Sequence, residues 1–163
     1  MKLPLTIILI LVAIYLSQCN FKKETVHYPP DFSFQLKSSA FAYDSQKQLY
    51  TRNFTSKSIS IKVGLTDNEL QSIFEYIQQI EFISFPEKFE CEKYGTITEP
   101  SFHTSIEVNY EKKFKQSTNT TGCSPKTQLT NSDNFDRLAD KIIRVLESKK
   151  AIKDMPKSDI IFL

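Results

Sequence analysis

Apolar and polar residues alternate with a period of two in several stretches of the chain, a pattern typical of half-buried β-strands. These stretches are 32–37, 48–54, 59–63, 101–110 and 113–117. Tyr43-Asp44-Ser45 has the composition of a turn between the first two stretches, and Glu111-Lys112 predicts a tight turn between the last two. Short links between successive strands favour antiparallel pairing. The pattern therefore predicts a three-stranded meander followed, later in the chain, by a hairpin.

Two other stretches have the period of an amphipathic helix. Thr66 and Glu69 have the spacing of a capping box, in which each side chain bonds the backbone amide of the other residue. The apolar residues after this box share one helical face: Leu70, Ile73, Phe74, Ile77 and Ile80. A second helix is predicted from about Asp133 to Ser148, with Asn131 or Ser132 as its cap. Its apolar stripe consists of Phe135, Leu138, Ile142, Val145 and Leu146.

The predicted order is strand-strand-strand-helix-strand-strand-helix, which indicates an α+β fold with one antiparallel sheet of about five strands. Both helical stripes need apolar cover, so we expect the two helices to pack on one face of the sheet. The other face would then be open to water or to a partner. Its candidate binding residues are polar: Lys62, Ser101, His103, Ser105 and Glu107.

The N-terminus has the pattern of an export signal. Lys2 is followed by the largely apolar run Leu3–Leu16 and then by Ser17-Gln18-Cys19. Leu16 and Ser17 fit the lipobox of bacterial lipoproteins, in which the signal is cut before a lipid-modified cysteine, whereas Gln18 departs from it. An ordinary cleaved signal and an uncleaved anchor are the alternatives, although the run is shorter than the roughly 20 residues of a spanning helix. In lipoproteins of bacteria with two membranes, Asp directly after the cysteine favours retention in the inner membrane. Asn20 stands at this position, so we expect the protein in the outer membrane rather than the inner one.

These observations divide the chain into a signal peptide (1–18), a lipidated cysteine with its tether (19–31) and one α+β domain (32–163). Removal of 18 residues from 163 leaves 145, with 20 basic and 19 acidic residues, so the net charge is close to zero. A balanced charge gives no electrostatic case for nucleic-acid binding. The chain has only 3 glycines and no glycine-rich phosphate-binding motif, and we expect no cofactor. We expect the chain to be monomeric.

Two cysteines remain after Cys19 is assigned to the lipid. Exported domains usually pair such cysteines, so we expect a disulfide between Cys91 and Cys123. The alternative makes Cys91 a nucleophile with His103 as its base. The acidic neighbours Glu90 and Glu92 disfavour it, because nearby negative charge raises the pKa of a thiol.

Other candidate chemistry is weaker. Ser101, His103, Ser105 and Glu107 suggest a Ser-His-Glu hydrolase, but no nucleophile-elbow motif is present and a solvated sheet face explains the same residues. The acidic cluster at Glu87, Glu90 and Glu92 lacks a second histidine or a cysteine pair, so we expect no metal site there. The apolar C-terminus, 159–163, is expected to dock on the domain as an edge strand, or to bind a partner.

The layout resembles a family of small bacterial lipoproteins of Gram-negative type, for which no activity is established. The resemblance rests on Tyr43-Asp44-Ser45, Leu65-Thr66 with Glu69, Ser84-Phe85-Pro86, Glu99–Phe102 and Met155-Pro156 with Asp159–Phe162. It implies no functional residues. We therefore expect a non-enzymatic binding or structural module attached to the membrane of the cell envelope, with a possible envelope protein as partner. The alternatives are an inhibitor or immunity-type lipoprotein that acts on an envelope hydrolase, and a hydrolase itself.

Overall fold

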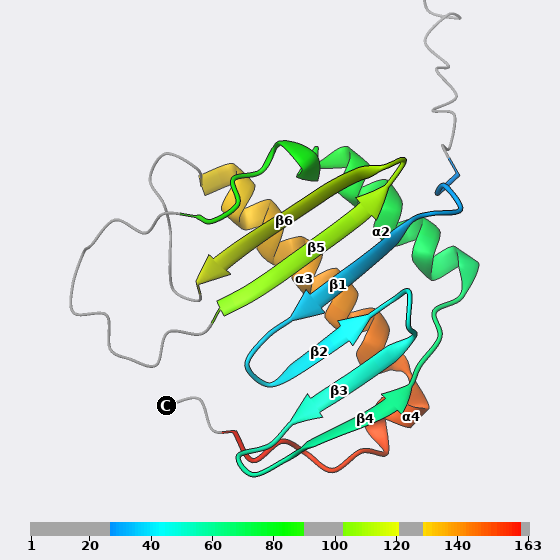
Figure 1. Cartoon of the computed structure of the whole chain (residues 1–163), viewed down its shortest axis with the longest axis vertical. Helices are drawn as coiled ribbons and strands as arrows, with labels where there is room; N and C mark the ends of the chain where they lie inside the picture. The colour runs from blue at the N-terminus through cyan, green and yellow to red at the C-terminus, as the bar shows by residue number, and fades with distance from the viewer. Residues whose placement is uncertain (1–26, 90–102, 121–128, 161–163) are drawn as a thin grey trace, which may run out of the picture.

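A computed structural model describes residues 27–89, 103–120 and 129–160 of the chain. Six strands form one fully antiparallel sheet in the order β4-β3-β2-β1-β5-β6 (Figure 1). Their bounds are β1 Ser33–Lys37, β2 Phe41–Asp44, β3 Leu49–Asn53, β4 Ser58–Lys62, β5 His103–Tyr110 and β6 Lys113–Thr120. The central pairing of β1 with β5 joins the N-terminal meander to the later hairpin.

The α+β class and the antiparallel sheet are confirmed, but the expectation of about five strands and the predicted element order are wrong. The missed strand is β2, where Tyr43-Asp44 was predicted to be a turn. In the structure the turn begins after Asp44, whose carboxylate accepts a hydrogen bond from the amide of Lys47 at 2.9 Å. Gln48 closes this turn with a left-handed φ of 51°. The meander therefore has four strands rather than three.

The helices are α2 (Asp67–Gln79), the short 3₁₀ helix η1 (Phe82–Ser84), α3 (Leu129–Ser148) and α4 (Lys150–Lys153). The predicted capping box is present: the Glu69 amide donates to the Thr66 hydroxyl at 3.3 Å, and the Thr66 amide donates to the Glu69 carboxylate at 2.8 Å. The second helix begins earlier than predicted, at Leu129. Asn131 and Ser132 therefore lie within α3 and do not cap it.

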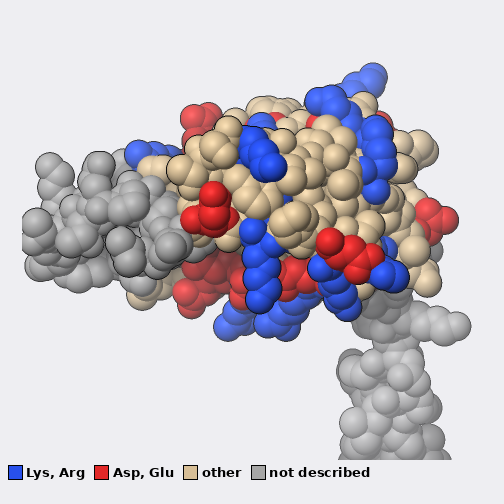
Figure 2. All heavy atoms as spheres, turned by 90° about the horizontal axis from the view of Figure 1, so that it is seen from below, with Lys and Arg blue, Asp and Glu red and all other residues tan. Residues whose placement is uncertain are grey.

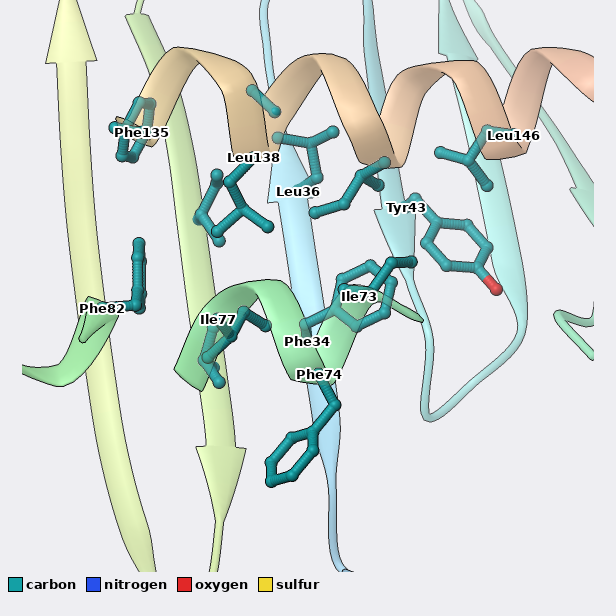
Figure 3. Packing of buried hydrophobic residues seen from close by; sticks show 14 of the residues in the cluster. Phe34, Leu36, Tyr43, Ile73, Phe74, Ile77, Phe82, Phe135, Leu138 and Leu146 are labelled. Atoms are coloured by element: carbon teal, nitrogen blue, oxygen red, sulfur yellow. The ribbon is translucent and has the colours of Figure 1, made fainter. Parts of the chain in front are cut away.

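Both long helices lie on one face of the sheet (Figure 1), and the core fills the space between the two layers (Figure 3). Alternate residues of the strands point into this core, among them Leu36 and Ile106, which are fully buried. Ile73 and Ile77 from α2 and Leu138 from α3 meet them from the helical side (Figure 3). An aromatic cluster closes the core beneath β6; its members are Phe82, Phe85, Phe89 and Phe135.

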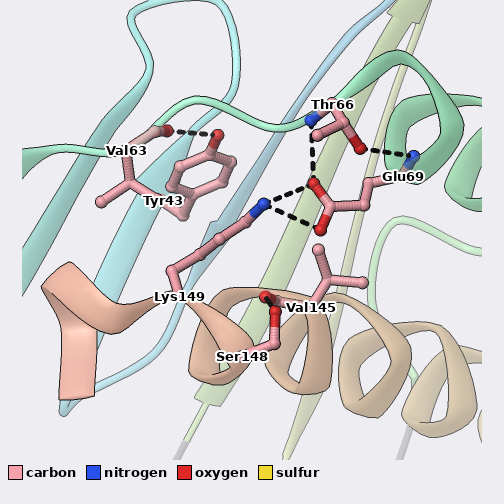
Figure 4. A network of polar contacts seen from close by, with 7 residues as sticks. All are labelled: Tyr43, Val63, Thr66, Glu69, Val145, Ser148 and Lys149. Atoms are coloured by element: carbon pink, nitrogen blue, oxygen red, sulfur yellow. Dashed lines mark hydrogen bonds and ion pairs between the residues drawn. The ribbon is translucent and has the colours of Figure 1, made fainter.

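A polar network joins the start of α2 to the end of α3 (Figure 4). The Lys149 ammonium donates to both carboxylate oxygens of Glu69, at 2.8 and 2.5 Å. Burial acts to raise the pKa of Glu69, but the hydrogen bonds from Lys149 and Thr66 outweigh it and hold this pKa below its usual value. The Tyr43 hydroxyl donates to the Val63 carbonyl at 3.0 Å, and burial raises the pKa of Tyr43 to about 12. The Glu69–Lys149 pair thus links the start of α2 to the end of α3.

The segment after α4 is held by β3 and by the turn that follows it. The Arg52 guanidinium donates to the carbonyl oxygens of Met155 and Pro156, at 3.2 and 2.8 Å. The amide of Thr55 donates to the Asp159 carboxylate at 2.8 Å. Of the residues 159–163 that were predicted to dock as an edge strand, only Asp159 and Ile160 are described, and neither lies in a strand of the sheet. Residues 161–163 lie outside the described part.

Candidate functional site

The face of the sheet that points away from the helices is the candidate site, and its composition follows from strand alternation. Because Ile106 and Val108 point into the core, their neighbours on β5 point outward. His103, Ser105 and Glu107 therefore lie in line on the outer face, as predicted. Lys62 also lies on this face, but β4 places it at the opposite edge of the sheet. Ser101 lies outside the described residues.

Glu107 forms an ion pair with Lys37 on the neighbouring strand β1. Lys37 donates to the Glu107 carboxylate at 2.6 Å, in the middle of the outer face. Glu107 is well shielded, with 17% of its side chain exposed, whereas 51% of the Lys37 side chain is exposed. The sequence pattern assigns Lys37 to the polar face of its strand, but the pairing of β1 with β5 could not be read from it.

Short polar side chains bond to one another across the strands of this face. The His103 ring nitrogen Nδ1 lies 3.0 Å from the Thr120 hydroxyl on β6. The Ser105 hydroxyl accepts from the Gln116 amide at 3.2 Å and from the Thr118 hydroxyl at 3.3 Å. At the other side of the sheet, the hydroxyls of Thr51 and Ser60 are 2.8 Å apart. Cross-strand contacts of this kind order the side chains that they join.

The two edges of the sheet differ. The segment Glu87–Phe89 lies along β6. The Phe89 amide donates to the Thr118 carbonyl at 3.0 Å, and the Thr118 amide donates to the Glu87 carbonyl at 2.9 Å. β4 pairs with β3 on one side, and no other described strand lies beyond it. The outer face is therefore bounded at β6 by the segment Glu87–Phe89 and at β4 by an edge with which no further described strand pairs.

A second polar cluster lies on the helical side, between the end of β6 and the start of α3. The buried Asn119 side chain donates to the Ser132 hydroxyl at 3.1 Å and to the Asp136 carboxylate at 3.0 Å. Burial raises the pKa of Asp136, the Asn119 hydrogen bond opposes this shift, and the charges of Asp140 and Asp133 add to it. Because both amide hydrogens of Asn119 are used, the cluster anchors α3 to the sheet. The sequence pattern did not reveal it.

The remaining candidate chemistry is placed as follows. The hydrolase hypothesis linked His103 with Ser101, Ser105 and Glu107. Among the described residues, the His103 ring lies beside Thr120 and Glu107 pairs with Lys37; Ser101 lies outside them, so the hypothesis stays a prediction. Among residues 27–89, 103–120 and 129–160, no group of three or more His, Cys, Asp or Glu side chains could hold a metal ion. The three cysteines, Glu90 and Glu92 fall outside these ranges, so the lipidation and disulfide expectations remain predictions.

Charge does not mark one region of the face that Figure 2 shows. Basic and acidic side chains are interspersed on the face seen in Figure 2, and most of that face carries neither sign. None of the helices in the described part of the chain has both the length and the apolar character needed to cross a membrane. No protein-family model matches the sequence, and no curated protein is similar to it.

Proposed function

We propose that the chain is a lipid-anchored protein of the cell envelope whose domain is a non-enzymatic binding module, and that the outer face of the sheet is its binding surface. One observation carries the proposal: the described helices lie on one side of the sheet, and no described helix covers the outward faces of its six strands (Figure 1). Antiparallel sheets tolerate such a wet face, so exposure alone does not imply binding.

Hydrogen bonds fix several side chains of the outer face, and this favours a binding role over simple solvation. Ser105 is held by two hydrogen bonds, and Thr51 and Ser60 hold each other. Side chains that are already fixed lose little conformational freedom when a partner covers them, and this lowers the cost of association. The shielded Glu107 carboxylate and its Lys37 partner supply a charged contact near the centre of the face. Charged contacts of this kind contribute specificity and orientation in protein interfaces.

The anchor is tested separately from the binding face. The full chain and its Cys19→Ala variant are expressed in a bacterial host, and envelope fractions are partitioned between detergent and water. We expect the full chain in the detergent phase and the variant in the aqueous phase. If Cys19→Ala partitions like the parent chain and retains residues 1–18, the uncleaved-anchor alternative is correct.

The binding face is tested by affinity capture from envelope extract with three baits. The parent domain is compared with Ser105→Arg on the outer face and with Glu147→Arg, an exposed position of α3 on the opposite layer. We expect a protein that co-purifies with the parent and with Glu147→Arg but not with Ser105→Arg. A captured hydrolase whose activity falls on binding would favour the inhibitor class. Equal capture by all three baits would refute the assignment of the face.

A further inference from the structure

The turn between β5 and β6 is unusual in its backbone and in what it exposes. Glu111 and Lys112 both have left-handed φ angles, 49° and 62°. This is the geometry of a type I′ hairpin turn, which Asn and Gly adopt much more readily than Glu or Lys. The register that the turn imposes places Phe114 on the outer face, opposite Asn109. Phe114 is 61% exposed, the most exposed large hydrophobic side chain among the described residues.

Three lysines lie near this residue in the sequence, but the strand register places only the ring on the outer face, since Lys113 and Lys115 pair with the inward-pointing Tyr110 and Val108. Lys112 and Lys113 precede Phe114 and Lys115 follows it. The Lys113 ammonium lies 3.2 Å from the Glu111 carboxylate and 5.2 Å from the centre of the Tyr110 ring. A turn with lysines at its tip and on one face of the hairpin, and with an exposed aromatic ring on the other face, suits the boundary between lipid headgroups and acyl chains. One exposed apolar residue is nevertheless ordinary on a protein surface, so a second observation is needed.

The second observation is the position of the N-terminal segment. The amide of Lys112 donates to the Asp31 carboxylate at 3.3 Å, so the chain enters the domain beside the turn (Figure 1). Hydrogen bonds from the amides of Glu111 and Lys112 hold the pKa of Asp31 below its usual value. Tyr28 fixes the same segment to α2 through its hydroxyl, which donates to Asp67 at 2.9 Å.

The length of the tether limits how far this turn can be from the bilayer. Eight residue steps separate Cys19 from His27, since 27 − 19 = 8. At about 3.3–3.6 Å per residue, they span at most roughly 29 Å when fully extended. A lipid on Cys19 would therefore keep the β5–β6 turn within about one domain diameter of the membrane.

We propose that the β5–β6 turn is a second membrane contact, in which the Phe114 ring enters the interface of an anionic bilayer and Lys112, Lys113 and Lys115 lie among its headgroups. The inference rests on the proposed lipid anchor at Cys19. It also deepens the proposed function, because a turn at one end of the strands would hold them upright on the membrane. The outer face of the sheet then points sideways, where a neighbouring envelope protein can reach it.

The chain contains no tryptophan, so a single introduced tryptophan reports on its own surroundings. Phe114→Trp is the probe. Leu129→Trp is the matched control, because Leu129 is also exposed, at 48%. It lies at the start of α3, and this end of α3 contacts Asn119. Asn119 lies at the end of β6 that is far from the β5–β6 turn. Each full chain is purified from envelopes in detergent and reconstituted into vesicles of phosphatidylglycerol and phosphatidylethanolamine, or of phosphatidylcholine alone. Flotation measures attachment, and brominated lipids measure quenching.

We expect both chains to float. In the anionic vesicles, the tryptophan fluorescence of Phe114→Trp should shift to shorter wavelength and be quenched by the brominated lipids. The fluorescence of the Leu129→Trp control should do neither. Replacing Lys112 and Lys115 by Gln in the probe chain should shift the docking equilibrium by roughly fivefold for each lysine removed. Floating chains whose probe is quenched no more than the control would overturn the membrane contact and leave the anchor intact. A blue shift without quenching would overturn it in favour of a protein contact. Chains that do not float would overturn both proposals.

Discussion

The contrast between two residues of β5, Ile106 and His103, tests the architecture on which both proposals depend. Ile106 is fully buried against the helices, whereas His103 lies on the outer face. Ile106→Ala removes three carbon atoms from the core, and at about 0.8 kcal/mol each the lost transfer free energy is about 2.4 kcal/mol. A residual cavity adds to this loss, so we expect a total of about 3–4 kcal/mol, within the usual range for such changes.

His103→Ala should change the free energy of unfolding by no more than about 0.5 kcal/mol, as surface substitutions usually do. Its hydrogen bond to Thr120 is exposed, so water can replace the lost partner. Both variants are measured by urea unfolding followed by circular dichroism, in the exported chain carrying Cys19→Ser. With a slope near 2 kcal/mol per molar urea, a loss of about 3 kcal/mol lowers the midpoint by roughly 1.5 M.

Similar losses at the two positions would mean that both faces of the sheet are buried. That result would refute the open outer face and remove the basis of the proposed binding surface. If Ile106→Ala left the free energy of unfolding unchanged, Ile106 would not be buried between the sheet and the helices, and the described core would be wrong. The slope of the transition must stay constant in each variant, because a change in slope would indicate a different unfolded state rather than a lost contact.

Three further outcomes follow from the structure. The folded-state pKa of Glu69 is lowered, so its contact with Lys149 stabilises the fold above the unfolded-state pKa, and this stabilisation is lost as the pH falls through the folded-state pKa. Glu69→Gln should therefore lower the free energy of unfolding at neutral pH and flatten its decline in acid. Urea midpoints measured across this pH range would show both effects. The raised pKa of Asp136 has the opposite sign: ionisation costs stability above the folded value, and protonation relieves that cost as the pH falls. Asp136→Asn should therefore raise the neutral midpoint and steepen the decline in acid. Free-thiol titration of the unreduced, unfolded and lipidated chain should find no reactive thiol if Cys91 and Cys123 are bridged, and two reactive thiols would refute the disulfide.

Local signals predicted the parts of the fold that local interactions determine. The capping box at Thr66 and Glu69 needs only four consecutive residues, and the apolar stripe of α2 has the same local origin. The alternation in β5 and the turn at Glu111-Lys112 were predicted for the same reason. The strand β2 was missed because Phe41–Asp44 is only four residues long and ends in residues that also favour turns.

Tertiary contacts decided the features that the sequence pattern did not reveal. Ser132 has the residue type of a helix cap, yet it is buried inside α3 because Asn119 of β6 donates to its hydroxyl. Likewise, only the pairing of β1 with β5 brings Lys37 to Glu107. The sequence pattern could predict which residues point outward, but not which outward residues are neighbours. For a candidate site on a sheet, this second question decides the chemistry.

The binding surface is therefore a product of strand order rather than of any one motif. One row of outward residues crosses all six strands: Ser60, Thr51, Ala42, Lys37, Ser105 and Thr118. Three of its members come from β2, β3 and β4 and one from β1, whereas the other two come from the hairpin, at least 45 positions later in the sequence. Only the small Ala42 and the charged Lys37 interrupt its hydroxyl groups. Since hydroxyls at both ends of the row bond to a neighbour, a partner would meet a row of largely fixed side chains, with the charged member Lys37 near its centre.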